Sequence, residues 1–221
     1  MIIGIPKEIK THEYRVALTP EGVKTLSDLG HQIIVQSMAG DAIGFSNQAY
    51  QAAGASIVDS AKTVFDQAEM VIKVKEPQEI ECKMMSKGQV LFTYLHLAAD
   101  PKQTELLLAS GAACIAYETI TDDNGRLPLL QPMSEIAGRM SIQSGAHHLE
   151  KTQGGSGVLL SGATGVNPAQ VLVLGGGVVG MNATKVALGM GAQVTILNRS
   201  LSKRLTDFQQ NHGSQLSVDL S

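Results

Sequence analysis

The sequence has no tryptophan, and aromatic residues of all kinds make up only 4% of its 221 residues. Proteins that bind single-stranded nucleic acid usually stack its bases on aromatic side chains, so this scarcity argues against that class. Lysine and arginine together number 17 and aspartate and glutamate 20, which gives a net charge of −3. Because there is no basic excess, we do not expect a nucleic acid as a partner.

The sequence also lacks the signals of secreted, metal-binding and membrane proteins. Its two cysteines, Cys82 and Cys114, show no CxxC or metal-ligand spacing and read as reduced residues of the core. The opening segment 1–6 is too short for a signal peptide, and no apolar run approaches the ~20 residues of a membrane span. We therefore expect a cytoplasmic protein with no metal and no membrane contact.

What the sequence does have is a glycine-rich loop between a predicted strand and a predicted helix. Residues 171–174 form an uncharged, β-branched and aliphatic run, typical of a strand that is buried on both faces. The next six, 175–180, read GGGVVG, a G-x-G-x-x-G. In such a loop Gly175 allows a tight turn, Gly177 lets a diphosphate approach the backbone, and Gly180 lets the helix pack on the sheet.

The helix that begins at about Val178 strengthens this interpretation. Its first turn, which includes Val179, offers unpaired backbone N–H groups and a partial positive charge to a phosphate. A second strand, 193–197, follows the helix, with Asn198 at its tip. The context predicts a dinucleotide site, and a glycine-rich turn that binds no ligand remains the alternative.

Strand and helix signals alternate along the whole chain, which predicts an α/β protein with mostly parallel sheets. The expected strands are 1–5, 31–35, 56–58, 70–74, 90–95, 113–117, 171–174, 193–197 and 216–220; the expected helices are 19–29, 46–53, 60–68, 79–85, 101–110, 133–151, 178–190 and 201–210. We predict two Rossmann-like parallel-sheet domains joined by a long helix: a substrate domain at 1–130, a connecting helix and linker at 131–167, and a dinucleotide-binding domain at 168–221. The last segment holds one half of a dinucleotide fold, so we expect this second domain to be truncated.

Ligands of open parallel sheets bind beyond the carboxyl ends of the strands. Four side chains that follow predicted strands could form such a site: Arg15, Lys75, His96 and Glu118. An arginine can hold a carboxylate through two parallel hydrogen bonds, and a lysine can hold the same group or polarise a carbonyl. An imidazole can transfer a proton near neutral pH. Together they predict a pocket for a small keto or amino acid, with a nicotinamide as the hydride carrier.

Each of these residues also has a plainer interpretation. Arg15 lies in a highly charged loop and could be solvated, and Lys75 could form a surface salt bridge. His96 lies in the apolar run 92–97, where a hydrogen-bonded core histidine is common. Glu118 could stand behind the pocket or pair with a cation. The residues alone leave these alternatives open.

Several segments resemble the alanine dehydrogenases and the related NAD(P) transhydrogenase subunit. They are residues 1–9, 15–20, 71–77, 91–98, 132–140 and the loop 175–180. The similarity extends over the whole chain, and the histidine-containing segment favours the alanine dehydrogenases. The resemblance implies reversible oxidative deamination of L-alanine to pyruvate and ammonia with NAD, by a hexameric enzyme.

The resemblance also implies roles for individual residues. By position, Arg15 and Lys75 would bind the carboxylate and carbonyl of the substrate, and His96 would be the acid/base. Besides the glycines, the residues implied to contact the dinucleotide are Ser134, Val178, Val179, Asn198, Lys203 and Ser221.

The chain departs from the family pattern in two respects. The family usually has an aspartate at the position of Asn198, so with Arg199 beside it NADP becomes a possible cofactor. Family members also continue past Ser221, and we expect no turnover from residues 1–221 alone. A transhydrogenase subunit, or a non-catalytic fragment that binds nucleotide or oligomerises, are the alternative functions.

Overall fold

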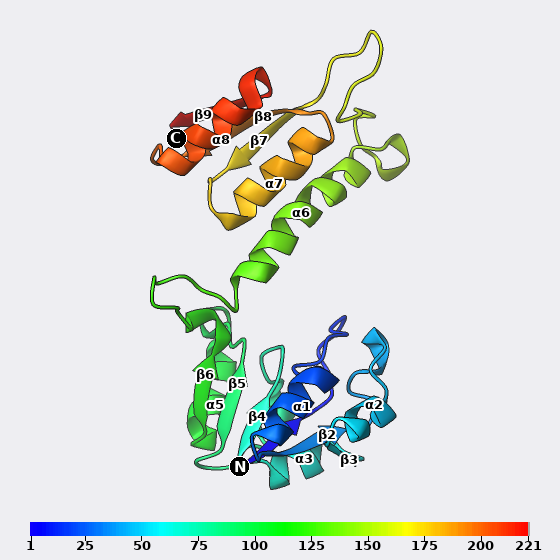
Figure 1. The fold of residues 1–221 in the computed structure, drawn as a ribbon, viewed down its shortest axis with the longest axis vertical. Helices are drawn as coiled ribbons and strands as arrows, with labels where there is room; N and C mark the ends of the chain where they lie inside the picture. Colours follow the sequence, from blue (N-terminus) through cyan, green and yellow to red (C-terminus); the bar gives the residue numbers. More distant parts are fainter. Residues whose placement is uncertain (221) are drawn as a thin grey trace. The chain divides into compact units, whose positions relative to one another are not determined.

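The structure, a computed structural model, describes residues 1–220. The chain divides into two compact units, Met1–Thr121 and Asp122–Ser221, and each contains its own parallel sheet (Figure 1). The α/β class and the two parallel sheets predicted from the sequence are confirmed. No helix in the described part of the chain is long and apolar enough to cross a membrane.

The first unit is built on a six-stranded parallel sheet in the order β3-β2-β1-β4-β5-β6. Its strands are β1 (Ile2–Ile5), β2 (Gln32–Gln36), β3 (Ser56–Val58), β4 (Met70–Ile72), β5 (Val90–Thr93) and β6 (Ala113–Ala116), and its α-helices are α1 (Pro20–Asp28), α2 (Asn47–Ala52), α3 (Ala61–Gln67), α4 (Glu79–Cys82) and α5 (Pro101–Ser110). The strand order reverses between β1 and β4. In such sheets this reversal opens a crevice at the carboxyl ends of the two central strands, where ligands bind.

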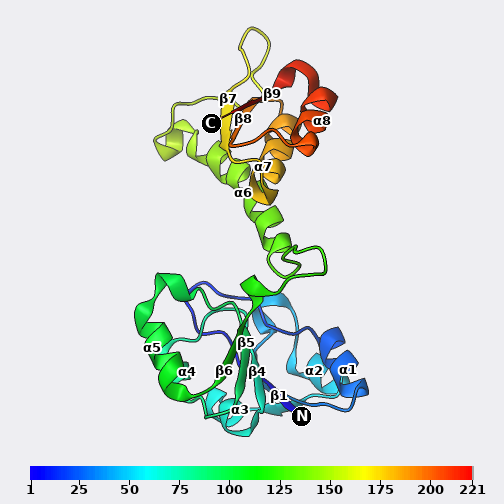
Figure 2. The same ribbon diagram turned by 90° about the vertical axis from the view of Figure 1, so that its left-hand side faces the viewer.

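Hydrophobic side chains fill both faces of this sheet. In β2, Ile33 belongs to a core cluster with Val23 of α1 and Tyr50 of α2. The next residue, Ile34, belongs to a second cluster with Phe65 of α3. This alternation follows from the two-residue period of a strand. Figure 2 shows the result, with α1 and α2 on one side of the sheet and α4 and α5 on the other.

Side-chain caps determine where four helices of this unit begin. Thr19, Ser46, Ser60 and Asp100 each accept a hydrogen bond from the backbone N–H three residues ahead. Such a cap satisfies one of the N–H groups that a helix start leaves unpaired. The sequence predicts helices from residues 19, 46, 60 and 101, so the starts of α1, α2, α3 and α5 are confirmed to within one residue.

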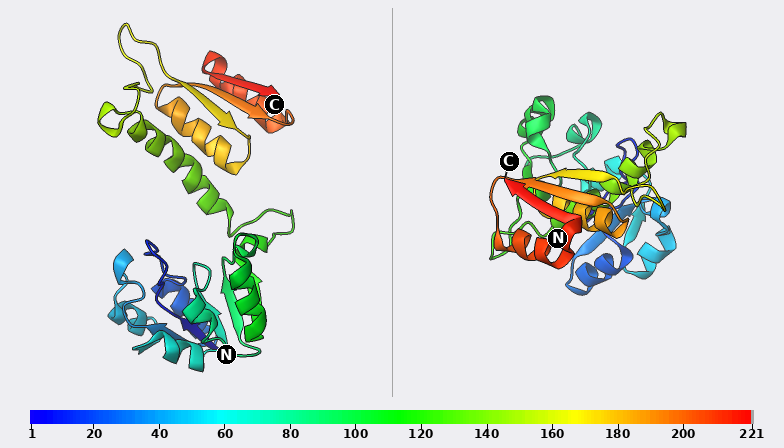
Figure 3. Two further views of the ribbon diagram at one scale, coloured as in Figure 1. Left: turned by 180° about the vertical axis from the view of Figure 1, so that it is seen from behind. Right: turned by 90° about the horizontal axis from the view of Figure 1, so that it is seen from above.

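The second unit contains a three-stranded parallel sheet in the order β7-β8-β9, with helices against one of its faces (Figure 3). Its elements are β7 (Gln170–Leu174), β8 (Gln193–Asn198), β9 (Leu216–Leu220), α6 (Gln131–His148), α7 (Val178–Gly189) and α8 (Lys203–His212). Single 3₁₀ turns lie at Asp41–Ile43, Leu97–Ala99, Tyr117–Thr119, Lys151–Gln153 and Gly213–Gln215. The three strands and two crossover helices correspond to one half of a dinucleotide-binding fold.

The prediction that strand β7 is buried on both faces is wrong. Val173 is buried, but Leu172 and Leu174 are 59% and 76% exposed. Right-handed crossovers between neighbours in the order β7-β8-β9 place α7 and α8 on the same face of the sheet. Within residues 1–220 the opposite face has no covering helix, so the side chains that point to it meet solvent.

Helix α6 is packed into the core of the second unit, although the sequence analysis assigned residues 131–167 to a connector. Ile142 and Ala146 pack against the core cluster formed by α7 and the sheet. In the middle of α6, a Cβ on Gly138 would lie 2.2 Å from the carbonyl oxygen of Val179. The glycine therefore lets the two helices approach closely.

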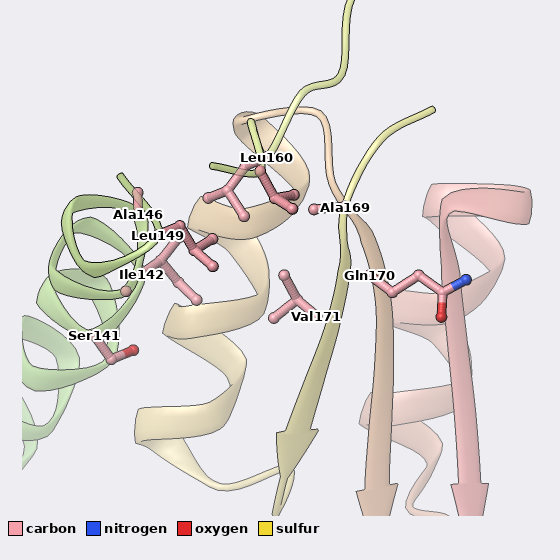
Figure 4. A pocket seen from close by; sticks show the side chains of 10 residues that line it. Ser141, Ile142, Ala146, Leu149, Leu160, Ala169, Gln170 and Val171 are labelled. Atoms are coloured by element: carbon pink, nitrogen blue, oxygen red, sulfur yellow. The ribbon is translucent and has the colours of Figure 1, made fainter. Parts of the chain in front are cut away.

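A largely apolar pocket of about 480 Å³ lies between α6 and β7. Figure 4 shows Ile142 and Leu149 facing Leu160 and Val171 across it. Because β7 is hydrogen-bonded only to β8 among the described residues, this pocket adjoins the open edge of the sheet.

Candidate functional site

Two of the loop glycines are required by the fold of the loop itself. Gly175 has a φ of +98°, a conformation that favours glycine, and its N–H donates to the carbonyl oxygen of Leu197 at 2.8 Å. A Cβ on Gly180 would lie 1.8 Å from the carbonyl oxygen of Gly175 and 3.1 Å from Cγ1 of Val173. The tight turn and the close contact of helix and strand are the geometries that the motif predicts.

Gly177 differs, because nothing within the described residues 1–220 requires a glycine there. Its φ is −74°, and a Cβ built on it would have no atom within 4 Å. Gly177 is also the N-cap of α7, and among the described residues no side chain caps this helix. The first N–H groups of α7 and the open space above Gly177 therefore fit an anionic group such as a diphosphate.

Two hollows border the start of α7, and both are lined by Ser134 and Val178. One, of about 540 Å³, extends along β7 and is also lined by Gly177 and Val179. The other, of about 550 Å³, is lined by four cations and a single carboxylate, Glu135. The cations are Arg126, Arg139, Lys185 and Arg204. The positive charge suits a phosphate-bearing ligand, and the sequence analysis did not identify these four residues.

Asn198 connects the end of β8 to the glycine loop. Its Oδ1 accepts the N–H of Gly176 at 3.0 Å, and its Nδ2 donates to the carbonyl oxygen of Ser200 at 2.7 Å. Lys203 is the exposed first residue of α8. The remaining predicted dinucleotide contact, Ser221, lies outside the described residues.

In the first unit, Arg15 is joined to a neighbouring carboxylate that the sequence analysis did not single out. Nε and Nη2 of Arg15 donate to the two carboxylate oxygens of Glu13, at 2.8 and 2.5 Å. This hydrogen bonding with Arg15 holds the pKa of Glu13 below its ordinary value and raises the pKa of the guanidinium. The pairing fixes where the guanidinium lies in its loop.

Lys75 also acts on the carboxylate of Glu13, through its charge. Its positive charge contributes to the lowered pKa of Glu13, behind the larger effect of Arg15. Its backbone carbonyl accepts a hydrogen bond from Oγ1 of Thr93 at 2.9 Å, which ties the residue to β5. The charges of Arg15 and Lys75 therefore both act on the carboxylate of Glu13.

His96 is exposed and stands in a left-handed turn directly after β5, with φ 50° and ψ 35°. The alternative of a buried core histidine does not hold. Its backbone N–H donates to Oε1 of Glu118 at 2.7 Å, and the N–H of Leu95 donates to the same carboxylate at 3.1 Å. Glu118 therefore holds the turn that presents the imidazole, by accepting backbone N–H groups.

Tyr94 links the arginine to the histidine. Its ring lies nearly parallel to the imidazole of His96, with centroids 6.1 Å apart, and it meets the ring of Tyr117 edge-on. Burial raises the pKa of Tyr94, while the nearby charge of Arg15 lowers it and that of Glu118 raises it. All four residues that the sequence placed beyond strand ends thus lie at one edge of the sheet.

The edge carries two cations and an imidazole, with the buried ring of Tyr94 behind the imidazole. Such groups can orient a small ligand by its carboxylate and exchange a proton with another group of that ligand. The sequence did not point to Glu13, in the charged loop beside Arg15, or to Tyr94, within the segment 91–98. Within residues 1–220, no three histidine, cysteine, aspartate or glutamate side chains are grouped as a metal site would require.

Replacing Glu118 with alanine is expected to destabilise the first unit by about 1–3 kcal/mol at pH 7, because two backbone N–H groups lose their acceptor. Burial alone would raise the pKa of Glu118, but hydrogen bonds from His96 and Leu95 hold it below its ordinary value. Its contribution is therefore present at neutral pH and lost as the pH falls through the lowered value.

Urea unfolding measured from pH 7 to pH 3 tests this prediction. The difference in unfolding free energy between the parent chain and Glu118→Ala should shrink on acidification. Glu105→Ala, an exposed glutamate of α5, should stay within about 0.5 kcal/mol of the parent throughout. An equal effect of both substitutions at pH 7 would contradict the assignment.

Comparisons with known proteins support the interpretation of both units. The model of the alanine dehydrogenase/PNT N-terminal domain matches residues 4–137, and that of the C-terminal domain matches residues 141–219. The alanine dehydrogenase of Halomonas elongata is 58% identical over 203 residues, which are 92% of this chain and 55% of that protein. That of Methanococcus maripaludis is 52% identical over 221 residues, 100% of this chain and 59% of that protein.

Among solved structures, an L-alanine dehydrogenase superposes with a TM-score of 0.91 at 51% sequence identity. The match covers 100% of this chain and 61% of the other. The chain therefore spans somewhat more than half the length of the relatives that it matches.

Proposed function

Because the chain belongs to the alanine dehydrogenase/PNT family, we propose that it forms part of an alanine dehydrogenase. In this proposal the loop 175–180 binds a nicotinamide dinucleotide, and the edge that carries Arg15, Lys75 and His96 binds L-alanine or pyruvate. The observation that supports the substrate site best is the convergence of these three side chains beyond the strand ends, where doubly wound sheets bind ligands.

Each side chain has a role that its chemistry suits. The guanidinium of Arg15, oriented by Glu13, binds the substrate carboxylate. The ammonium of Lys75 donates to the carbonyl oxygen of pyruvate and polarises it. The imidazole of His96 transfers a proton to and from the substrate as the amine is replaced by the carbonyl.

The dinucleotide fits the second unit through groups that this chain supplies. N–H groups at the start of α7 and the cations around the neighbouring hollow would hold its diphosphate. When bound, a nicotinamide accepts the hydride released from the α-carbon of alanine. The uncharged Asn198 does not repel a 2′-phosphate and Arg199 stands next to it, so we include NADP as well as NAD.

Gly177→Ala tests the dinucleotide site, because it fills the open space above the loop without a clash inside the protein. We expect affinity for NADH, measured by calorimetry, to fall at least about tenfold, corresponding to ~1.4 kcal/mol. NADPH should bind the parent chain within about tenfold of NADH, and a much stronger preference for NADH would remove NADP from the proposal. Unchanged NADH binding by Gly177→Ala would contradict the site.

The hexameric assembly and cytoplasmic location are proposed on the resemblance to the family alone. Sedimentation of the purified chain would show whether residues 1–221 assemble without the remaining length of the relatives.

A further inference from the structure

A cluster of buried charges lies next to the edge of the first unit that carries Arg15, Lys75 and His96. Lys73 is 0% exposed and lies between two buried glutamates, Glu8 and Glu81. Its Nζ lies 3.0 Å from Oε2 of Glu8 and 2.7 Å from Oε1 of Glu81. Removing three charges from water is costly, so such a cluster calls for an explanation beyond stability.

One carboxylate of this cluster contacts the backbone of the proposed substrate-binding lysine. Oε1 of Glu8 accepts the N–H of Val74 at 2.6 Å and lies 3.4 Å from the N–H of Lys75. The other carboxylate, Glu81, accepts the N–H of Gln78 instead. Both glutamates thus contact the ammonium of Lys73. Glu8 also contacts the backbone of Val74 and Lys75, whereas Glu81 contacts that of Gln78.

The strand topology explains why Glu8 is needed there. Strand β1 pairs with β4 only at Ile3–Met70 and Gly4–Val71, and β1 ends at Ile5. Beyond that point, no strand of the described residues 1–220 lies on the β1 side of Val74 and Lys75. There the carboxylate of Glu8 accepts the N–H of Val74, as a strand carbonyl does within the sheet.

The other side of the same segment is held by β5. The N–H of Tyr94 donates to the carbonyl oxygen of Val74 at 3.3 Å, and Oγ1 of Thr93 donates to that of Lys75 at 2.9 Å. The backbone of Lys75 is therefore held on both sides: its N–H faces the carboxylate of Glu8, and its carbonyl accepts from Thr93. The carboxylate of Glu8 is in turn held by the ammonium of Lys73.

We propose that Glu8 is a positioning residue for Lys75, held in place by the buried ammonium of Lys73, with Glu81 as the second carboxylate on that ammonium. The inference rests on the proposed function in one respect, that Lys75 binds the carbonyl or carboxylate of the substrate. Beyond that function, Glu8 in the loop after β1 determines where the ammonium of Lys75 points, because it holds the backbone of Lys75.

Glu8→Gln and Glu81→Gln form a matched pair, because each removes one negative charge beside Nζ of Lys73. Only Glu8→Gln weakens the acceptor on the backbone of Lys75. Two quantities are measured on the full 221-residue chain: the exchange rates of the Val74 and Lys75 amide hydrogens, and the dissociation constant for pyruvate. Lys75→Met controls for the contribution of the ammonium itself.

We expect Glu8→Gln to raise both exchange rates at least tenfold and to weaken pyruvate binding at least fivefold. Glu81→Gln should leave both quantities within about twofold of the parent. Lys75→Met should abolish pyruvate binding and leave the exchange of Val74 unchanged. If Glu8→Gln does not fold, Glu8→Asp keeps the charge but shortens the reach and should change both quantities in the same direction.

Equal effects of Glu8→Gln and Glu81→Gln on exchange would overturn the inference, as would unchanged exchange in Glu8→Gln. If the parent chain binds no pyruvate, the proposed function fails at this site. The exchange comparison would still decide whether Glu8 positions the backbone of Lys75, so the two failures are distinguishable.

Discussion

Gly180→Ala is expected to destabilise the second unit by about 3 kcal/mol, at the upper end of the range for overpacking. The added Cβ would lie 1.8 Å from the carbonyl oxygen of Gly175, and backbone cannot give way as a flexible side chain can. Gly175 itself is held by its positive φ and by a hydrogen bond to Leu197. The helix would have to move away from β7 to make room.

Gly177→Ala provides the matched control in the same loop. It adds the same methyl group where no atom lies within 4 Å, so the change in stability should stay within about 0.5 kcal/mol. Urea unfolding followed by far-UV circular dichroism, with amide exchange in β7 and β8, measures both variants. Equal stabilities would show that close contact between α7 and β7 does not depend on Gly180.

Lys73→Met is expected to destabilise the first unit by about 3–5 kcal/mol at pH 7, because it leaves two carboxylates buried without their cation. Glu8 and Glu81 are each at least 92% buried as whole residues and so receive little screening from water. Guanidinium unfolding of the parent and the variant at pH 7 measures the effect.

The loss should diminish as the pH is lowered. Burial already raises the pKa of Glu81 in the parent chain, and the charge of Lys73 opposes that rise. Without Lys73 the pKa of Glu81 in the folded state rises further. Protonation of Glu81 then favours folding, so the loss of stability is largest at a pH above the ordinary pKa of a glutamate. Lys62→Met, which breaks an exposed pair with Asp66, should cost less than about 1 kcal/mol at any pH. Equal losses in both variants would contradict the account.

Much of the fold could be predicted because its signals are local. The caps Thr19, Ser46, Ser60 and Asp100 lie next to the helices that they start, and their hydrogen bonds span three residues. The exposure of Leu174 could not be predicted in this way. It depends on which elements cover the far face of β7, and the strand sequence itself carries no information about them.

The site residues were found from strand ends, but their partners were not. Glu13 lies two residues from Arg15, yet a charged loop gives no indication of which carboxylate turns toward the guanidinium. The pairing of Lys73 with Glu8 spans 65 residues and arises only when β1 and β4 become neighbours. Glu118 was taken as a residue behind the pocket or a partner for a cation, and its acceptance of backbone N–H groups depends on the turn at His96.

The central claim is that the edge carrying Arg15, Lys75 and His96 binds a small 2-oxo acid. Titration of the isotopically labelled chain with pyruvate, followed by amide chemical shifts, tests it most directly. We expect the largest saturable shifts at residues 13–15, 74–75 and 95–96. Acetate, which lacks the 2-oxo group of pyruvate, should bind more weakly. The absence of saturable shifts at these residues, in a chain that still binds NADH, would contradict it.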